Sequence, residues 1–147
     1  MKTPHDSPAP RRLYLDTSAY LCVLLGEERA EAIAKLTADA ELLSSVLLVL
    51  ETHRNLVRLA REGSLKASEY TACLARLHQD QHRFQLRDLT LDLCQSGALP
   101  AVSTPRSLGL AHLRTALWFH AEGHIDRFVT LDEAQAEAAR ELGLPVA

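Results

Sequence analysis

The chain has 147 residues, the usual size of one domain, and its formal net charge of −3 gives no overall positive field that would draw it onto nucleic acid. Apolar residues make up 47% and charged residues 24% of the sequence, which argues against a disordered or fibrous protein. Cys22, Cys73 and Cys94 are odd in number and widely spaced, so they indicate neither a disulfide framework nor a zinc site.

The N-terminal residues differ in composition from the rest of the chain. They contain three prolines and no apolar run, so we interpret 1–11 as a flexible tail and 12–147 as a single domain. The apolar runs at 19–25 and 46–50 are far shorter than the roughly 20 residues that a membrane helix needs. We therefore expect a soluble, cytoplasmic protein that does not enter a membrane.

Strand and helix patterns alternate along the chain. Thr104 and Pro105 form the clearest helix start, and Gly63 and Gly143 are positioned to end helices. In chain order we predict a strand at 12–16, helices at 17–25 and 27–40, a strand at 42–46, a helix from 44 or 45 to 63, a helix from 68, a strand within 84–91, a helix at 104–122, a strand at 127–130, a helix at 132–142 and an edge strand at 145–146.

This alternation predicts an α/β fold with a central, mainly parallel, twisted sheet of about four or five strands, covered by helices on both faces. In open sheets of this kind, ligands bind outside the carboxyl ends of the strands. Candidate functional residues are therefore sought where the predicted strands end.

Two predicted strands end in an aspartate, Asp16 and Asp132, and Glu51 lies about one and a half turns into the helix after the second strand. All three acids belong to the same edge of the predicted sheet. Neighbouring carboxylates repel one another unless a proton or a cation intervenes, and oxygen ligands suit Mg²⁺ or Mn²⁺. A divalent cation held by these acids is one hypothesis.

The same residues have a purely structural interpretation, which spacing alone does not exclude. Asp16 and Asp132 are well placed to cap the helices that follow them, and Asp132 with Gln135 has the spacing of a capping box. Glu51 on its own is an ordinary solvated helix residue. Both interpretations remain open at this point.

Four segments of the chain resemble the motifs of the PIN domain family. They are Leu13-Tyr-Leu-Asp-Thr-Ser-Ala19, Ser44-Ser45 through Leu50-Glu51, Arg106-Ser-Leu-Gly-Leu-Ala-His-Leu-Arg-Thr-Ala-Leu117, and Phe128-Val-Thr-Leu-Asp-Glu133 with Leu142-Gly-Leu-Pro-Val146. The resemblance covers nearly the whole chain, and the motifs stand in the family's order.

The resemblance implies a three-layer α/β/α fold and an Mg²⁺- or Mn²⁺-dependent endoribonuclease, most often the toxin of a VapBC-type toxin–antitoxin pair. Asp16, Glu51 and Asp132 match the family's first, second and fourth acids, and so become the expected catalytic and metal-binding residues. The third acid is replaced by Gly109. The resemblance also implies an antitoxin partner and a homodimer.

Several further residues invite a functional or a plain interpretation. Arg54 and Arg58 share a helix face with Arg61, beside Glu51, and are candidate RNA contacts, although solvated helix arginines are the commoner explanation. The pairs His78/His82 and His120/His124 have zinc-ligand spacing but no obvious third ligand, which favours surface histidines.

Two functions follow from these observations. The first is a metal-dependent endoribonuclease toxin that hydrolyses RNA phosphodiesters and is neutralised by its antitoxin. The second is a degenerate PIN domain, with weak or no catalysis, that binds RNA or an antitoxin. Gly109 is the feature that favours the second.

Overall fold

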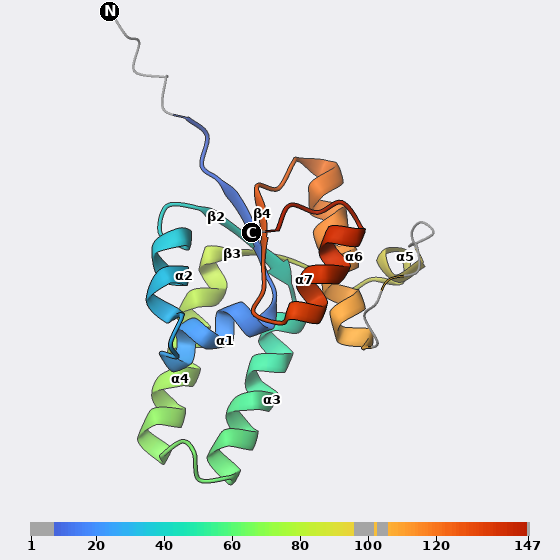
Figure 1. Cartoon of the computed structure of the whole chain (residues 1–147). Coiled ribbons are helices and arrows are strands. Elements are labelled where there is room, and N and C mark those ends of the chain that lie inside the picture. Colours follow the sequence, from blue (N-terminus) through green and yellow to red (C-terminus); the bar gives the residue numbers. More distant parts are fainter. Residues whose placement is uncertain (1–7, 96–101, 103–105, 147) are drawn as a thin grey trace, which may run out of the picture.

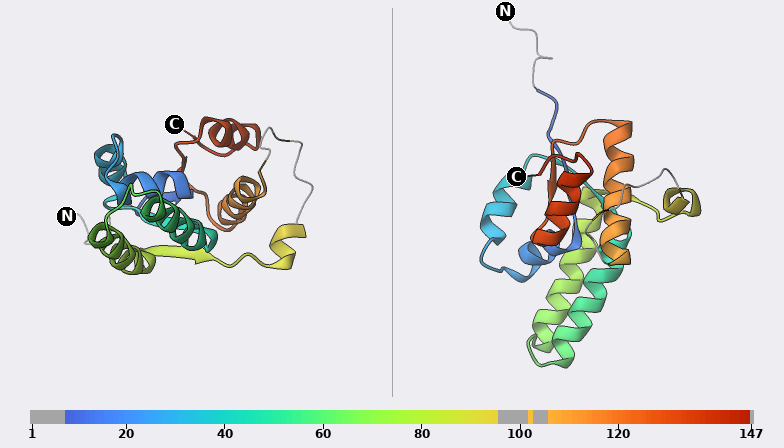
Figure 2. Two further views of the ribbon diagram at one scale, coloured as in Figure 1. Left: turned by 90° about the horizontal axis from the view of Figure 1, so that it is seen from below. Right: turned by 45° about the vertical axis from the view of Figure 1, so that its right-hand side comes forward.

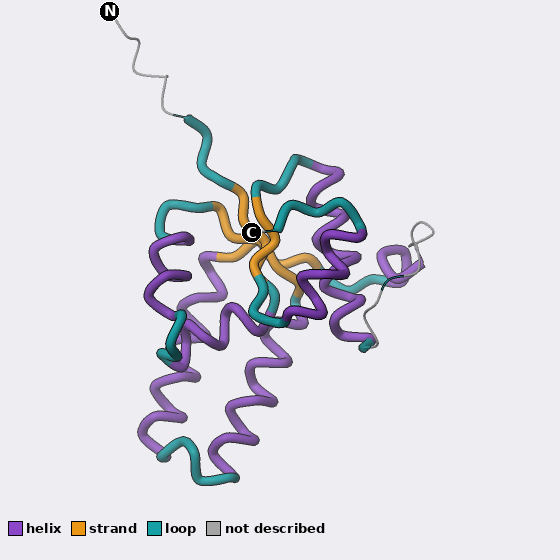
Figure 3. Tube along the Cα trace, in the orientation of Figure 1, coloured by secondary structure: helices purple, strands orange, loops and turns teal. Residues whose placement is uncertain are grey.

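A parallel β-sheet forms the centre of the computed structural model, which describes residues 8–95, 102 and 106–146 (Figure 1). The strand order is β3-β2-β1-β4, and each pair of neighbours is parallel. Val146 forms an isolated bridge with Phe128, so the predicted edge strand is reduced to one pairing. The strands, orange in Figure 3, are β1 (Arg12–Leu15), β2 (Glu41–Ser45), β3 (Phe84–Arg87) and β4 (Arg127–Val129).

Helices connect the strands and cover both faces of the sheet. Within the described residues they are α1 (Thr17–Leu25), α2 (Ala30–Thr37), α3 (Leu47–Arg61), α4 (Ala67–Asp80), a short 3₁₀ helix η1 (Gln81–Arg83), α5 (Leu91–Gln95), α6 (Ser107–Glu122) and α7 (Glu133–Glu141). The structure thus has the α/β class and the three-layer α/β/α arrangement that the sequence predicts.

Alternating strand side chains divide the core into two layers. On one face Tyr14 and Phe128 stack with ring centroids 5.3 Å apart, and α6 and α7 pack over them. On the other face Leu13 and Leu15 lie against α1 and α2. Burying an aliphatic side chain of this size is worth about 1.5–3 kcal/mol, so the alternation fixes which face each helix covers.

Helices α3 and α4 form a pair that extends beyond the carboxyl ends of the strands. The two views of Figure 2 and the view of Figure 1 show them side by side. Tyr20, Leu48 and Leu77 form the buried cluster that joins this pair to α1. This packing brings the first turns of α3, and with them Glu51, to the sheet edge where β1 ends.

Some element boundaries differ from the predictions. The helix predicted at 27–40 is confined to Ala30–Thr37. Gly26 adopts a left-handed conformation in the turn that ends α1, and a second turn, closed by Ala40 N and Thr37 O, follows the helix. The short helix α5 was not predicted; the Thr90 hydroxyl accepts a hydrogen bond from Leu93 N near its start. The Thr104-Pro105 helix start lies outside the described residues.

Two other predictions about the chain can be compared with the structure. The three cysteines are unpaired. In the part of the chain that the structure describes, no helix is both long enough and apolar enough to cross a membrane.

Candidate functional site

Asp16 stands immediately after β1 and is the most deeply buried carboxylate of the site, with 5% of its surface exposed. Oδ1 accepts hydrogen bonds from Ser18 Oγ at 2.6 Å and from Ala19 N at 3.2 Å, and Oδ2 accepts one from Thr130 Oγ1. Burial raises the pKa of Asp16, and these hydrogen bonds offset only part of that effect. Asp16 therefore does cap α1, but at the cost of a desolvated carboxylate.

The Ser18 and Thr130 hydroxyls, which donate to Asp16, also accept hydrogen bonds from the backbone of the segment after β4. Ser18 Oγ accepts a hydrogen bond from Leu131 N at 2.9 Å, and Thr130 Oγ1 accepts one from Asp132 N at 3.1 Å. The two hydroxyl oxygens are themselves 3.2 Å apart. The end of β1 and the segment that leads into α7 are thus joined by hydrogen bonds of polar side chains.

Glu51 belongs to a second polar network, which includes Thr17 of α1 and His112 of α6. Its Oε1 accepts hydrogen bonds from Thr17 Oγ1 and from His112 Nε2, both at 2.8 Å. His112 Nδ1 lies 2.7 Å from the hydroxyl of Tyr14. Because an ionised carboxylate only accepts, His112 Nε2 is the donor to Glu51, and the Tyr14 hydroxyl is the partner of Nδ1.

The environment of Glu51 shifts its pKa in the opposite direction to that of Asp16. Partial burial on its own would raise the pKa of Glu51, but the hydrogen bond and charge of His112, together with the Thr17 hydroxyl, bring it below the ordinary value. Glu51 is thereby kept ionised, whereas Asp16 holds its proton more tightly.

Asp132 is exposed and acts as the N-cap of α7. Its Oδ1 accepts hydrogen bonds from Ala134 N at 3.0 Å and Gln135 N at 3.3 Å. The predicted capping box is incomplete, because the Gln135 side chain does not return to the cap. Instead its Nε2 donates to Gly109 O at 2.8 Å and so joins α7 to α6.

The three acids predicted from the sequence line one cleft of about 510 Å³ at the carboxyl edge of the sheet. Gly109 and His112, both from α6, line the cleft together. Among the described lining residues, Arg106 alone carries a permanent positive charge. The complete lining within the described residues is Asp16, Thr17, Ser18, Glu51, Arg106, Ser107, Leu108, Gly109, His112, Asp132, Ala134 and Gln135.

The donor chemistry of this cleft suits a hard divalent cation. Within the described residues, Asp132 Oδ2 and Glu51 Oε2 accept no hydrogen bond, so each has an oxygen available. The acids line the cleft but do not converge on one metal position. In the described ranges, no group of three or more His, Cys, Asp or Glu side chains is arranged to hold a metal ion.

The structure places the other candidate residues away from the cleft. Arg58 forms an ion pair with Glu62 at 3.1 Å, and neither it nor Arg54 is among the lining residues. His78 and His82 stack edge to face, and His120 accepts a hydrogen bond from Ile125 N.

Sequence reasoning missed two elements of the site. The sequence places Tyr14 in a strand, but the contact of its hydroxyl with His112 joins positions 98 residues apart, which no local pattern reveals. Arg106 had a detectable signal, since it begins the segment that resembles the third family motif.

No protein-family model matches the chain, and a search of curated proteins gives no match.

The Tyr14 hydroxyl provides a first test of the buried network. We predict that Tyr14→Phe lowers the free energy of unfolding by about 1–3 kcal/mol, because the substitution leaves His112 Nδ1 without its buried partner. Urea denaturation would measure the change. Tyr70→Phe, on a partly exposed tyrosine of α4, is the matched control and should stay within about 0.5 kcal/mol. Equal stability of both variants would contradict the network.

The burial of Asp16 predicts a pH-dependent cost. Because folding raises the pKa of Asp16, the folded chain binds that proton more tightly than the unfolded chain. Stability therefore falls as the pH rises from about 4 through the raised pKa. In EDTA, Asp16→Asn should raise Tm by a few degrees at neutral pH and by less in acid.

The matched control for this measurement is Asp132→Asn. Asparagine and aspartate cap helices about equally well, and Asp132 is exposed, so its Tm should be nearly unchanged. A loss of stability in Asp16→Asn at neutral pH would contradict the assignment of Asp16 as a desolvated carboxylate.

Proposed function

We propose that this protein is a metal-dependent endoribonuclease of the PIN type that hydrolyses RNA phosphodiesters. The observation that supports the proposal is the meeting of Asp16, Glu51 and Asp132, from three distant parts of the chain, in one cleft at the carboxyl edge of a parallel sheet. Capping alone accounts for Asp16 and Asp132 but does not account for Glu51, which is aligned by His112 and Thr17.

The three carboxylates are the residues that would hold Mg²⁺ or Mn²⁺. A divalent cation there would acidify water and stabilise negative charge developing on a phosphate. Ser18 and Thr130 fix the orientation of Asp16, and His112 keeps Glu51 ionised and directed into the cleft. A bound cation would also relieve the desolvation that raises the pKa of Asp16.

RNA would reach this acidic cleft past Arg106. Its side chain is exposed at the start of α6 and lines the cleft, so it can pair with a phosphate next to the bond that is cut. Arg54 and Arg58 of α3 are less suited to this role, because neither lines the cleft.

The toxin assignment is part of the same proposal and rests on the family resemblance. It implies a cytoplasmic toxin that forms a homodimer and is neutralised by a cognate antitoxin. Growth arrest on expression of the chain, relieved by the protein encoded beside it, would test this assignment.

RNA cleavage tests the catalytic proposal directly. A mixed pool of single-stranded RNA should be cut in Mn²⁺, and more slowly in Mg²⁺, by the unaltered chain, and not at all in EDTA or by Asp16→Asn. Gly109→Asp should cut faster at the same metal concentration, because it adds a fourth carboxylate to the wall of the cleft.

Gly109→Asn is the control for this experiment. It matches the aspartate in size and backbone effect but lacks the charge, so it should not cut faster than the unaltered chain. Silence from both the unaltered chain and Gly109→Asp would overturn the nuclease proposal.

Gly109 also supports a second candidate function. With glycine at the position of the family's third acid, the chain would be an RNA- or antitoxin-binding domain with little or no catalysis. Cleavage by Gly109→Asp, combined with silence of the unaltered chain, would favour this alternative.

Binding can be separated from cleavage in the Asp16→Asn background. We predict that Arg106→Ala weakens RNA binding and reduces the salt dependence of log K by about one phosphate contact. Arg58→Ala should change little, because Arg58 is not among the residues that line the cleft. Fluorescence anisotropy of a labelled RNA at several salt concentrations would measure both variants. A larger effect of Arg58→Ala would move the RNA path to α3.

A further inference from the structure

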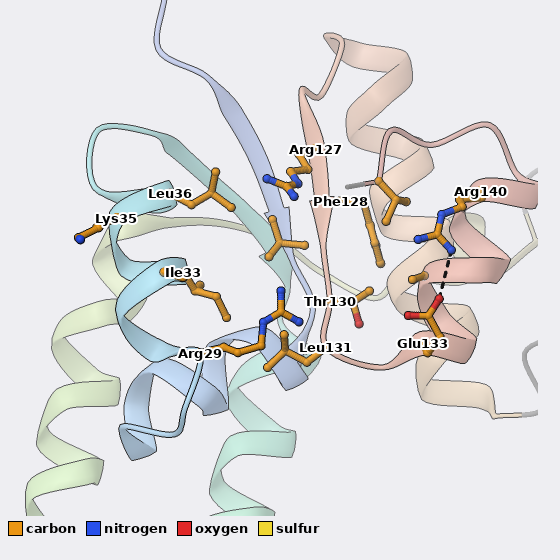
Figure 4. Close-up of a pocket in the computed structure, with 14 residues that line it drawn as sticks. Arg29, Ile33, Lys35, Leu36, Arg127, Phe128, Thr130, Leu131, Glu133 and Arg140 are labelled. Atoms are coloured by element: carbon orange, nitrogen blue, oxygen red, sulfur yellow. Dashed lines mark hydrogen bonds and ion pairs between the residues drawn. The ribbon is translucent and has the colours of Figure 1, made fainter.

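A second hollow, of about 480 Å³, lies between α2 and α7 and wraps around β4 (Figure 4). We call it the basic groove. It is separate from the acidic cleft, although both adjoin the segment that follows β4. Its lining within the described residues is Arg29, Ala32, Ile33, Lys35, Leu36, Arg127, Phe128, Val129, Thr130, Leu131, Glu133, Ala136, Arg140 and Val146.

The floor of the basic groove is aliphatic. Leu36, Leu131 and Val146 are partly exposed there, and Ile33 lies beneath them. The aromatic ring in the lining, Phe128, is 1% exposed, so it presents no face to a ligand. Such a floor accommodates apolar side chains but gives a nucleobase no ring to stack on.

The rim of the basic groove is cationic on both sides. Arg29 from the α2 side and Arg127 from β4 point into the hollow in Figure 4, with Arg140 across from them. Glu133 is the acidic residue among the described residues that line the groove, and it forms an ion pair with Arg140 at 3.3 Å. Within the described part of the chain, neither Arg29 nor Arg127 has an ion-pair partner.

This concentration of positive charge stands out on an acidic chain. The whole sequence has a formal net charge of −3, yet four cationic side chains and one carboxylate line this groove. Unpaired arginines beside apolar surface have the chemistry to bind carboxylates, which a planar guanidinium can engage with two hydrogen bonds.

We propose that the basic groove binds an acidic, amphipathic segment of a partner protein. Apolar side chains of the segment occupy the aliphatic floor, and carboxylates on either side of them pair with Arg29 and Arg127. The adjoining cleft repels the same carboxylates through Asp16, Glu51 and Asp132, so charge directs the segment to the groove. This inference does not depend on the nuclease proposal.

Peptide binding to the full chain in EDTA, measured by fluorescence anisotropy, tests this proposal. The probe is a labelled peptide of alternating leucine and glutamate. Its matched controls replace every glutamate by glutamine or every leucine by serine, and labelled oligouridylate represents RNA. The leucine–glutamate peptide should bind most tightly, and added salt should weaken its binding.

Charge reversal locates the binding surface. Arg29→Glu/Arg127→Glu should weaken binding of the leucine–glutamate peptide about tenfold or more. The control Arg61→Glu/Arg83→Glu makes the same change in net charge at exposed positions outside the groove and should have little effect. Leu131→Ser leaves the charge unchanged but removes an apolar side chain from the floor of the groove, so it should also weaken binding of this peptide.

Three results would overturn the proposal. The first is equal binding of the glutamate and glutamine peptides. The second is retention of peptide binding in both groove variants. The third is tighter binding of oligouridylate than of the peptide, with loss of the oligouridylate binding in Arg29→Glu/Arg127→Glu. The last result would make the groove a nucleic-acid surface. None of these readouts involves RNA cleavage, so the two proposals can fail separately.

Discussion

The arrangement of the cleft depends on a carboxylate that is buried where the first strand ends. Water is largely excluded from Asp16, and the hydroxyls of Ser18 and Thr130 replace only part of its hydration. Those hydroxyls come from α1 and from the segment after β4, so the groups that satisfy Asp16 also determine where α7 begins. Asp132 belongs to that segment, so the hydroxyls that accommodate the Asp16 carboxylate also help to position the second aspartate of the cleft.

Asp16 and Glu51 line the same cleft, yet their surroundings shift their pKa values apart. Desolvation dominates at Asp16 and raises its pKa, whereas the contacts from His112 and Thr17 outweigh desolvation at Glu51 and lower its pKa. Acids whose pKa values are shifted apart in this way are common at catalytic centres. The difference explains why Glu51, the weakest of the three candidates by spacing alone, carries much of the functional argument.

The sequence predicted the strands and the acids better than the network that supports them. Aspartates after apolar strands identify a sheet edge, because strand direction and side-chain alternation are local properties. The contacts of His112 with Tyr14 and Glu51 depend on how α6 crosses the sheet, which no local pattern encodes. Helical spacing likewise grouped Arg54 with Arg58 on one face of α3 but did not show that this face lies outside the cleft.

The two hollows beside the end of β4 have opposite charge, which separates the ligands that each can attract. An acidic cleft holds a polyanion only when a cation or a residue such as Arg106 offsets its carboxylates, so the proposed RNA binding would be favoured by a bound metal. The basic groove attracts carboxylates with no cation present. Thr130 lines the groove and donates to Asp16, so a segment seated in the groove would lie one hydrogen bond from the buried carboxylate while remaining excluded from the cleft.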